Sequence, residues 1–307
     1  MENRKLGSSD VEVSAVGVGC NNFGRRIHDV AVARAVVHRA LDLGITLFDT
    51  ADVYGNGTSE SFLGETLGSR RREAVIATKF GMGSPGGASR RTIMRTVEAS
   101  LKRLRTEWID LYQVHFPDRS TPIEETLRAL DDLVRQGKVR QIGCSNFSAK
   151  QVEDAQAVSQ KHGLAAFVTC QDEYSMLVRG IEHDRVPVMQ RYGMTLLPYA
   201  PLAGGFLTGK YQRGKPLPQN ARLAYSSHHA TDVVNERNWA MIEQIGALAS
   251  RLGLSMLELA FGWLLAQPVT AGVIAGASTP EQVEQNVRAG QAKLPADALD
   301  ALDRITR

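Results

Sequence analysis

Four residues that could carry out proton transfer stand at or near the ends of short apolar runs. They are Asp49, Tyr54, Lys79 and His115. Runs of four to six β-prone residues, such as 74–78 and 111–114, are typical of buried parallel strands. Because α/β folds place their chemistry at the carboxyl ends of such strands, we expect the four side chains to meet in one site.

The types of these residues indicate a particular chemistry. A free tyrosine has a pKa near 10 and is a poor acid at neutral pH. An ammonium group within about 4 Å stabilises the phenolate and lowers that pKa, and a carboxylate beside the lysine fixes its position and charge. The four residues therefore form a candidate proton donor to a carbonyl oxygen. They supply no electrophile or nucleophile of their own, so the site suits a cofactor that provides hydride.

Each residue also has a structural interpretation when it is considered alone. Lys79 could be a solvated loop lysine, His115 a half-buried histidine with satisfied hydrogen bonds, and Tyr54 a turn residue. A chemical alternative is a class I aldolase in which Lys79 forms a Schiff base. His228 and His229 lie in a polar stretch and are more typical of solvated residues than of ligands, so we expect no metal site.

Strand-like runs alternate with amphipathic helical patterns along the chain, which predicts βαβ units and a parallel sheet. The predicted strands are 15–19, 46–49, 74–79, 111–115, 139–144, 166–171, 195–199 and 271–275. The predicted helices between them are 30–43, 59–68, 92–104, 123–136, 150–162 and 279–289. Eight such units without a break in composition favour a closed (β/α)8 TIM barrel over an open sheet. We expect residues 1–307 to form one barrel domain.

Three further segments complete the predicted organisation. Residues 4–13 resemble a hairpin, which should cap the bottom of the barrel. Two extra helices, 238–251 and 256–266, fit between the seventh and eighth strands. The polar stretch 209–235 is too long for an ordinary connection and is a candidate functional loop.

Composition is that of an ordinary globular protein. Of the 307 residues 43% are hydrophobic, and 36 basic and 33 acidic residues give a net charge of +3. No basic block suggests a nucleic-acid partner. No apolar stretch has the length of a signal peptide or the roughly 18 residues of a membrane span. Three cysteines without metal-binding spacing fit a reducing cytosol, so we expect a cytoplasmic protein without a membrane partner.

Seven motifs, in the same order, resemble those of the aldo-keto reductases over nearly the full length of the chain. They are FDTADVYG (48–55), ATKFG (77–81), DLYQVH (110–115), GCSNF (143–147), QDEYS (171–175), PLAGGFLTGKY (201–211) and GASTPEQ (276–282). The last two are similar to segments of bacterial reductases related to the potassium-channel β subunits. The resemblance implies a (β/α)8 barrel that binds a nicotinamide dinucleotide without a Rossmann motif.

The resemblance also implies roles for the matching residues. Tyr54 would be the general acid, Lys79 and Asp49 would tune its pKa, and His115 would orient the substrate carbonyl. Other residues would bind the cofactor: Ser145, Asn146 and Gln171 at the carboxamide, Tyr199 against the ring, Pro201, Leu202, Gly204 and Lys210 at the pyrophosphate, and Gly276, Ser278, Gln282, Gln285 and Asn286 around the adenosine.

The choice between NADPH and NADH depends on a cation for the adenosine 2′-phosphate. Gly276, Ser278 and Gln282 are neutral, so the cation must come from the stretch 209–235, with Arg222 as the best candidate. A 2′-phosphate usually needs at least one arginine or lysine within reach. We therefore expect NADPH or NADP as the cofactor, with NADH possible.

The predicted substrate pocket departs from the family pattern. Asn21 and Asn22 stand where relatives often carry a bulky aromatic residue or methionine, and Phe116 keeps one aromatic wall. These residues suit small polar or aromatic aldehydes. The predicted function is NADPH-dependent reduction of aldehyde or ketone carbonyls to alcohols, with the proton from Tyr54. The alternative is a cofactor-binding regulatory subunit with little turnover.

Overall fold

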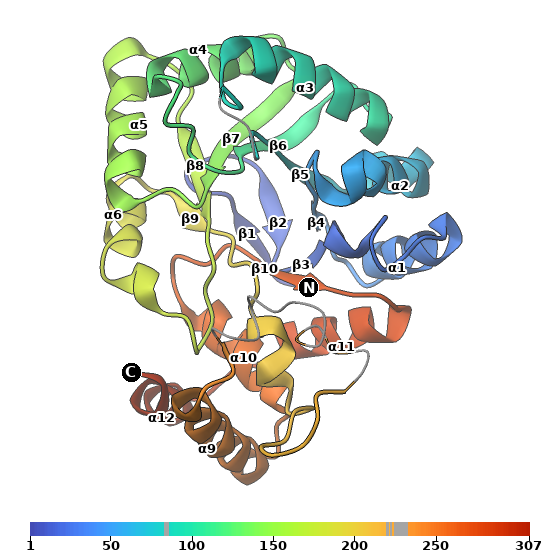
Figure 1. Ribbon diagram of the computed structural model, residues 1–307, viewed down its shortest axis with the longest axis vertical. Helices are drawn as coiled ribbons and strands as arrows, with labels where there is room; N and C mark the ends of the chain where they lie inside the picture. The colour runs from blue at the N-terminus through green and yellow to red at the C-terminus, as the bar shows by residue number, and fades with distance from the viewer. Residues whose placement is uncertain (83–85, 219–220, 222, 224–232) are drawn as a thin grey trace.

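An eight-stranded parallel sheet, curled into a barrel, forms the core of the protein (Figure 1). The computed structural model describes residues 1–82, 86–218, 221, 223 and 233–307. The strands follow the order β10-β3-β4-β5-β6-β7-β8-β9. They are β3 Val16–Gly19, β4 Leu47–Asp49, β5 Val75–Phe80, β6 Ile109–Val114, β7 Val139–Ser145, β8 Phe167–Gln171, β9 Thr195–Leu196 and β10 Val273–Gly276.

Backbone hydrogen bonds join the two edges of this sheet. The N–H of Leu196 in β9 donates to the carbonyl oxygen of Val269 at 2.7 Å, and the N–H of Ala271 donates back to Leu196 at 2.9 Å. The N–H of Ile274 in β10 donates to the carbonyl oxygen of Pro198 at 3.2 Å. The predicted (β/α)8 barrel is therefore confirmed, and its strands leave their carboxyl ends at one mouth.

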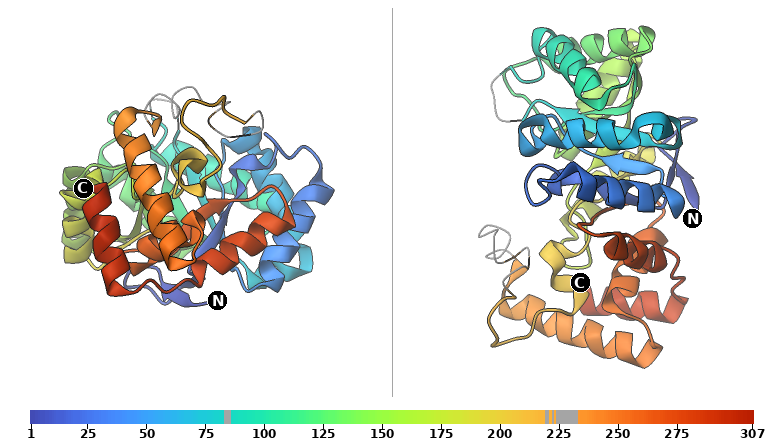
Figure 2. Two further views of the ribbon diagram at one scale, coloured as in Figure 1. Left: turned by 90° about the horizontal axis from the view of Figure 1, so that it is seen from below. Right: turned by 90° about the vertical axis from the view of Figure 1, so that its right-hand side faces the viewer.

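Helices surround the sheet on its outer face (Figures 1 and 2). They are α1 Val30–Asp42, α2 Thr58–Leu67, α3 Arg90–Leu104, α4 Ile123–Arg135, α5 Ala149–His162, α6 Arg185–Arg191, α9 Glu236–Leu252, α10 Met256–Ala266, α11 Pro280–Gly290 and α12 Ala296–Thr306. Local sequence fixes several starts. Ser148 and Gln151 form a capping box at α5, and Ser255 and Glu258 form another at α10. Such boxes satisfy N–H groups that have no partner within the helix.

The N-terminal hairpin closes the amino end of the barrel, as predicted. Strands β1 Asn3–Lys5 and β2 Glu12–Ser14 pair in antiparallel fashion. Leu6 and Val13 pack with side chains that the strands direct into the barrel, including Leu111 of β6. Gly7 has a φ of +54°, and a Cβ there would lie 2.4 Å from a backbone oxygen of β8. Only glycine allows this close approach.

The structure differs from the predicted elements in a few places. The seventh strand ends at Leu196 rather than at residue 199, because Pro198 has no N–H to donate to a sheet. The predicted extra helices correspond to α9 and α10, between β9 and β10. Helices α6 and α12 were not predicted; α12 begins after Pro295 without a side-chain cap, so its start carries no local signal. Residues 219–220, 222 and 224–232 of the predicted loop lie outside the described residues.

Among the described residues, no single helix is both long enough and apolar enough to cross a membrane. Helices α9 and α10 reach the required length and composition only as a pair, with a bend of 96° between them. No group of three or more His, Cys, Asp or Glu side chains suited to a metal ion occurs in the same part of the chain.

Candidate active site

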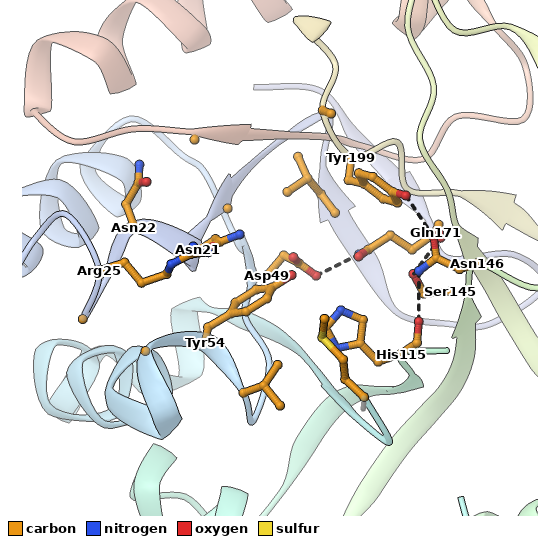
Figure 3. Close-up of a pocket in the computed structure, with 18 of the residues that line it drawn as sticks. Asn21, Asn22, Arg25, Asp49, Tyr54, His115, Ser145, Asn146, Gln171 and Tyr199 are labelled. Carbon is orange, nitrogen blue, oxygen red and sulfur yellow. Dashed lines mark hydrogen bonds between the residues drawn. The ribbon is translucent and has the colours of Figure 1, made fainter. Parts of the chain in front are cut away.

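A cavity of about 680 Å³ opens at the carboxyl ends of the strands (Figure 3). It collects residues from the carboxyl ends of all eight barrel strands or from the segments that follow them. The predicted site residues that line it are Asn21, Asn22, Asp49, Tyr54, His115, Phe116, Ser145, Asn146, Gln171, Tyr199 and Gly276. Residues separated by up to about 250 positions in the sequence thus share one hollow.

Lys79, which does not line the cavity itself, forms a buried ion pair with the cavity residue Asp49. The Nζ atom of Lys79 donates to both carboxylate oxygens of Asp49 and to the carbonyl oxygen of Thr50, each at 2.8 Å. The Nε2 atom of Gln171 donates to the same carboxylate at 2.8 Å. Burial alone would lower the pKa of Lys79, but Asp49 and Tyr54 outweigh it and raise the pKa above its ordinary value. The ammonium is therefore charged and fixed in place.

Tyr54 opens the short 3-10 helix η2, Tyr54–Gly57, which is the next element after β4 in the chain. Gly55 has a φ of +56°, and a Cβ there would lie 3.0 Å from the backbone of Gly24. This glycine lets the turn pack against the segment after β3 and directs Tyr54 into the cavity (Figure 3). The Nζ atom of Lys79 lies 5.2 Å from the centroid of the Tyr54 ring.

His115 follows β6 and packs edge-to-face against Tyr54, with 5.8 Å between the ring centroids. Burial, together with the nearby charge of Lys79, lowers the pKa of His115 to about 3. The imidazole is therefore neutral at physiological pH and can donate one N–H bond without carrying charge. Its Nδ1 atom is buried and has no partner among the described residues.

Ser145, Asn146, Gln171 and Tyr199 form a connected polar cluster on another side of the cavity (Figure 3). The strand register sets Ser145 of β7 beside Gln171 of β8, and the Ser145 hydroxyl donates to the Gln171 carbonyl at 2.8 Å. The amide of Asn146 donates to the carbonyl oxygen of His115 at 3.0 Å, and the Tyr199 hydroxyl donates to Asn146 at 2.9 Å. The bonds of Asn146 fix the direction of its amide group, and the bond to Asp49 fixes that of the Gln171 amide.

Asn146 adopts the left-handed conformation, with a φ of +61°. Ala200, directly after Tyr199, has a φ of +50°, and Asn56 has a φ of +54°. All three residues line the cavity. Asparagine tolerates this region, whereas alanine is strained there. Strained backbone that the surrounding structure holds in place is common at functional sites.

The residues predicted to bind the adenosine lie around the start of α11. The N–H of Ser278 donates to the side chain of Gln282 at 2.7 Å, and the amide of Asn22, after the neighbouring strand β3, donates to the Ser278 hydroxyl at 3.2 Å. Asn286 is buried on α11, and Gln285 is exposed beside it. Ser278, Gln282, Gln285 and Asn286 do not line the cavity itself but continue from its edge at Gly276.

The residues predicted to bind the pyrophosphate fall in the segment after β9. Pro201 and Leu202 precede the 3-10 helix η5, Ala203–Thr208, which contains Gly204. Lys210 follows it, and partial burial and the charge of Arg26 lower the pKa of Lys210. None of these four predicted residues lines the cavity. Arg222 lies outside the described residues.

The arrangement suits a nicotinamide dinucleotide. The cavity has room for a nicotinamide with a small substrate, since ligand pockets commonly measure about 300–1,000 Å³. Fixed amides and a hydroxyl on Ser145, Asn146 and Gln171 match the donors and acceptors of a carboxamide. The N-terminus of α11 follows Gly276 of the cavity edge in the chain, and a phosphate group would be favoured there.

Several cavity residues were missed by sequence reasoning. They include Arg25, Val53, Asn56 and Met82. All four lie two to seven residues beyond a strand end, in loop segments where neighbours such as Asn21, Asn22 and Tyr54 were predicted but these four were not. Arg25 could have been noticed, because it follows Asn21 and Asn22 in the same segment.

Asp52, between Asp49 and Tyr54, is a half-buried acid next to this site. Burial and the neighbouring carboxylate of Glu60 raise the pKa of Asp52 to about 6, although the charges of Arg103 and Lys79 oppose the rise. Its Oδ1 atom has no hydrogen-bond partner within the described chain. Asp52 is therefore held at a cost to stability.

Comparison with known proteins places the chain in a family. The model of the aldo/keto reductase family matches residues 15–307. A putative voltage-gated potassium channel subunit beta of Schizosaccharomyces pombe is 36% identical, over 98% of this chain and 92% of its own length. An uncharacterized oxidoreductase of Bacillus subtilis, YrpG, is 35% identical, over 99% of this chain and 96% of its own length. A probable channel subunit beta of Arabidopsis thaliana is 34% identical, over 94% and 91%.

A closed (β/α)8 barrel with polar, ionisable side chains gathered at its carboxyl mouth is the framework of a barrel enzyme. The chain belongs to the aldo/keto reductase family. The family predicted from the seven motifs is therefore confirmed.

Proposed function

We propose that the protein reduces aldehyde or ketone carbonyls to alcohols with NADPH. The observation that carries this proposal is a series of contacts at one cavity. Asp49 pairs with Lys79, Lys79 lies beside the ring of Tyr54, and Tyr54 packs against the neutral His115. A reduced nicotinamide, when bound, supplies the hydride to the carbonyl carbon.

The residues of the chain handle the proton. Tyr54 would give its hydroxyl proton to the carbonyl oxygen as the bond to hydrogen forms at carbon. The fixed ammonium of Lys79 would stabilise the phenolate that remains, because an opposite charge nearby favours the charged form. His115, being neutral, would donate an N–H bond to the carbonyl oxygen and set its direction. Asp49 keeps Lys79 charged and in position.

The cofactor would lie between two groups of residues. Ser145, Asn146 and Gln171 would bind the carboxamide, and Tyr199 would pack against the ring. The pyrophosphate and adenosine would extend past Gly276 toward the residues around η5 and α11: Pro201, Leu202, Gly204, Lys210, Ser278, Gln282, Gln285 and Asn286. Arg222 would pair with the 2′-phosphate and favour NADPH over NADH.

The aldolase alternative is disfavoured by the state of Lys79. A Schiff base requires a neutral amine. Here the Nζ atom makes three hydrogen bonds, and the pKa of Lys79 is raised. The lysine is 0% exposed, so a substrate carbonyl has no path to it without rearrangement.

A regulatory role is the second candidate, because two relatives carry the name of potassium channel β subunits. In that case the chain would bind the cofactor and act on a partner with little turnover.

We also infer that residues 1–307 act as one domain in the cytoplasm, which the free cysteines Cys20, Cys144 and Cys170 support.

A kinetic panel separates the two candidates. NADPH and NADH consumption is followed with graded aldehydes, ketones and quinones, and cofactor binding is measured in parallel by calorimetry. Many turnovers per molecule with at least one carbonyl class support the reductase. Tight NADPH binding with at most one turnover for every carbonyl would instead favour the regulatory role.

A further inference from the structure

The cavity has one polar wall that the proposed reduction does not use. Asn21 and Arg25 both line the cavity, and they follow β3 in the chain. The Nη1 atom of Arg25 donates to the side-chain oxygen of Asn21 at 2.9 Å, so the guanidinium is held at the cavity edge (Figure 3). That bond uses one of the five N–H donors of the guanidinium.

Arg25 gives this lining a positive charge. Among the described residues it forms no ion pair, and its contact with Asn21 is to a neutral oxygen. The other charged residue of the lining, Asp49, is paired with Lys79. His115 carries no charge at neutral pH, because its pKa is about 3. The described part of the cavity therefore attracts an anion.

A second wall is apolar and exposed. Met82 and Phe116, which follow β5 and β6, are 47% and 40% exposed. Among the described residues, the exposed large apolar side chains are Val32, Met82 and Phe116. Of these, Met82 and Phe116 line the cavity. The Phe116 ring stacks on His115, with 5.3 Å between centroids. Exposed apolar surface gathered at a cavity is typical of a ligand contact.

We propose that the substrate is an aromatic or apolar carbonyl compound that carries an anionic group, and that Arg25 and Asn21 bind the anion. The inference rests on the proposed function. With the carbonyl oxygen at Tyr54 and His115, the body of the substrate packs on Phe116 and Met82, and a carboxylate reaches Arg25. Arginine suits this role because its planar fork matches a carboxylate.

The test compares two substrates of equal shape, 4-carboxybenzaldehyde and the neutral 4-formylbenzamide. The measured quantity is the ratio of their kcat/KM values, so that differences in intrinsic reactivity cancel between variants. Arg25→Gln should lower the ratio by about 10-fold to 100-fold, the range expected for a lost charged hydrogen bond. Arg25→Lys should retain part of the preference, because the charge remains. Arg119→Gln removes the same charge from an exposed side chain that does not line the cavity and should hold the ratio within about twofold.

Two results would overturn the proposal. One is an unchanged ratio in Arg25→Gln. The other is an equal loss for both substrates with a higher Kd for NADPH, which would assign Arg25 to a cofactor phosphate. Calorimetry on the protein with NADP and either 4-(hydroxymethyl)benzoate or its amide tests anion preference without turnover. If neither aldehyde is reduced but the benzoate still binds more tightly through Arg25, the proposed reduction fails and the anion site stands.

Discussion

The Nζ atom of Lys79 lies 2.8 Å from both carboxylate oxygens of Asp49, and the two residues are 0% and 4% exposed. A pair so deeply buried is not screened by solvent. It therefore holds a fixed positive charge 5.2 Å from the ring centroid of Tyr54.

Removing the Tyr54 hydroxyl should abolish proton transfer while leaving the cofactor site in place. We expect Tyr54→Phe to lower kcat for aldehyde reduction at least about 100-fold, the usual scale for losing a general acid. The Kd for NADPH, measured by calorimetry, should change little. Turnover near the wild-type rate in this variant would remove Tyr54 from the mechanism.

Lys79→Met should act on the same proton as Tyr54→Phe. We therefore expect the two losses in kcat to be far from additive in the double variant. Because Lys79→Met also leaves the Asp49 carboxylate buried without its cation, the free energy of unfolding should fall by about 3–5 kcal/mol. Chemical denaturation measures this loss, and the variant with Asp49→Asn added should recover part of it. Full additivity in kcat would show that Lys79 acts independently of Tyr54.

His115 should make the protein less stable as the pH falls. Its pKa is about 3 in the folded protein and near 6.5 in the unfolded chain, so below pH 6.5 only the unfolded chain takes up the proton. Between pH 7 and pH 5 this linkage should cost about 2 kcal/mol. In His115→Gln the free energy of unfolding should not show this loss between pH 7 and pH 5. In His28→Gln, which changes an exposed histidine, the loss should remain. Parallel pH curves for wild type and His115→Gln would contradict the prediction.

Asp52→Asn should stabilise the protein at high pH. The pKa of Asp52 is about 6 when folded, above the value of about 3.9 for a free aspartate, so the folded state is penalised above pH 6. The penalty disappears as the pH falls toward 4, because the folded protein then holds the proton. We expect a gain in unfolding free energy of about 1–3 kcal/mol at pH 8 and little at pH 4. Asp10→Asn, at an exposed aspartate, should give no such gain at pH 8. A lower unfolding free energy of Asp52→Asn at pH 8 would contradict the raised pKa of Asp52.

Arg222 and Lys210 should affect the two cofactors differently. We expect Arg222→Ala to weaken NADPH binding by about 1.5–3 kcal/mol and to leave NADH almost unchanged, because only NADPH carries the 2′-phosphate. Lys210→Ala should weaken both, since both carry the pyrophosphate. Titration calorimetry gives the Kd values, with Lys215→Ala as a matched loss of charge in the same stretch. Equal losses for both cofactors in Arg222→Ala would mean that the preference has another source.

Much of the fold was legible in the sequence because its signals are local. Apolar runs such as 74–79 and 111–115 mark β5 and β6 to within two residues at each end. Capping residues such as Ser148 mark a helix start, because they bind N–H groups within three residues. Parallel strands of a barrel end at the same mouth, so residues at strand ends, such as Asp49 and His115, could be expected to lie near one another.

Tertiary structure decided how those residues meet. The contact of Gln171 with Asp49 spans 122 positions, and no local pattern encodes it. The neutral state of His115 depends on the burial of its ring and on the charge of Lys79, which lies on a different strand. Arg25 joins the cavity only because the segment after β3 packs against the turn at Gly55. Sequence determined which elements form, since they depend on neighbouring residues; closure of the barrel determined which side chains face one another, since that depends on register and packing across the whole chain.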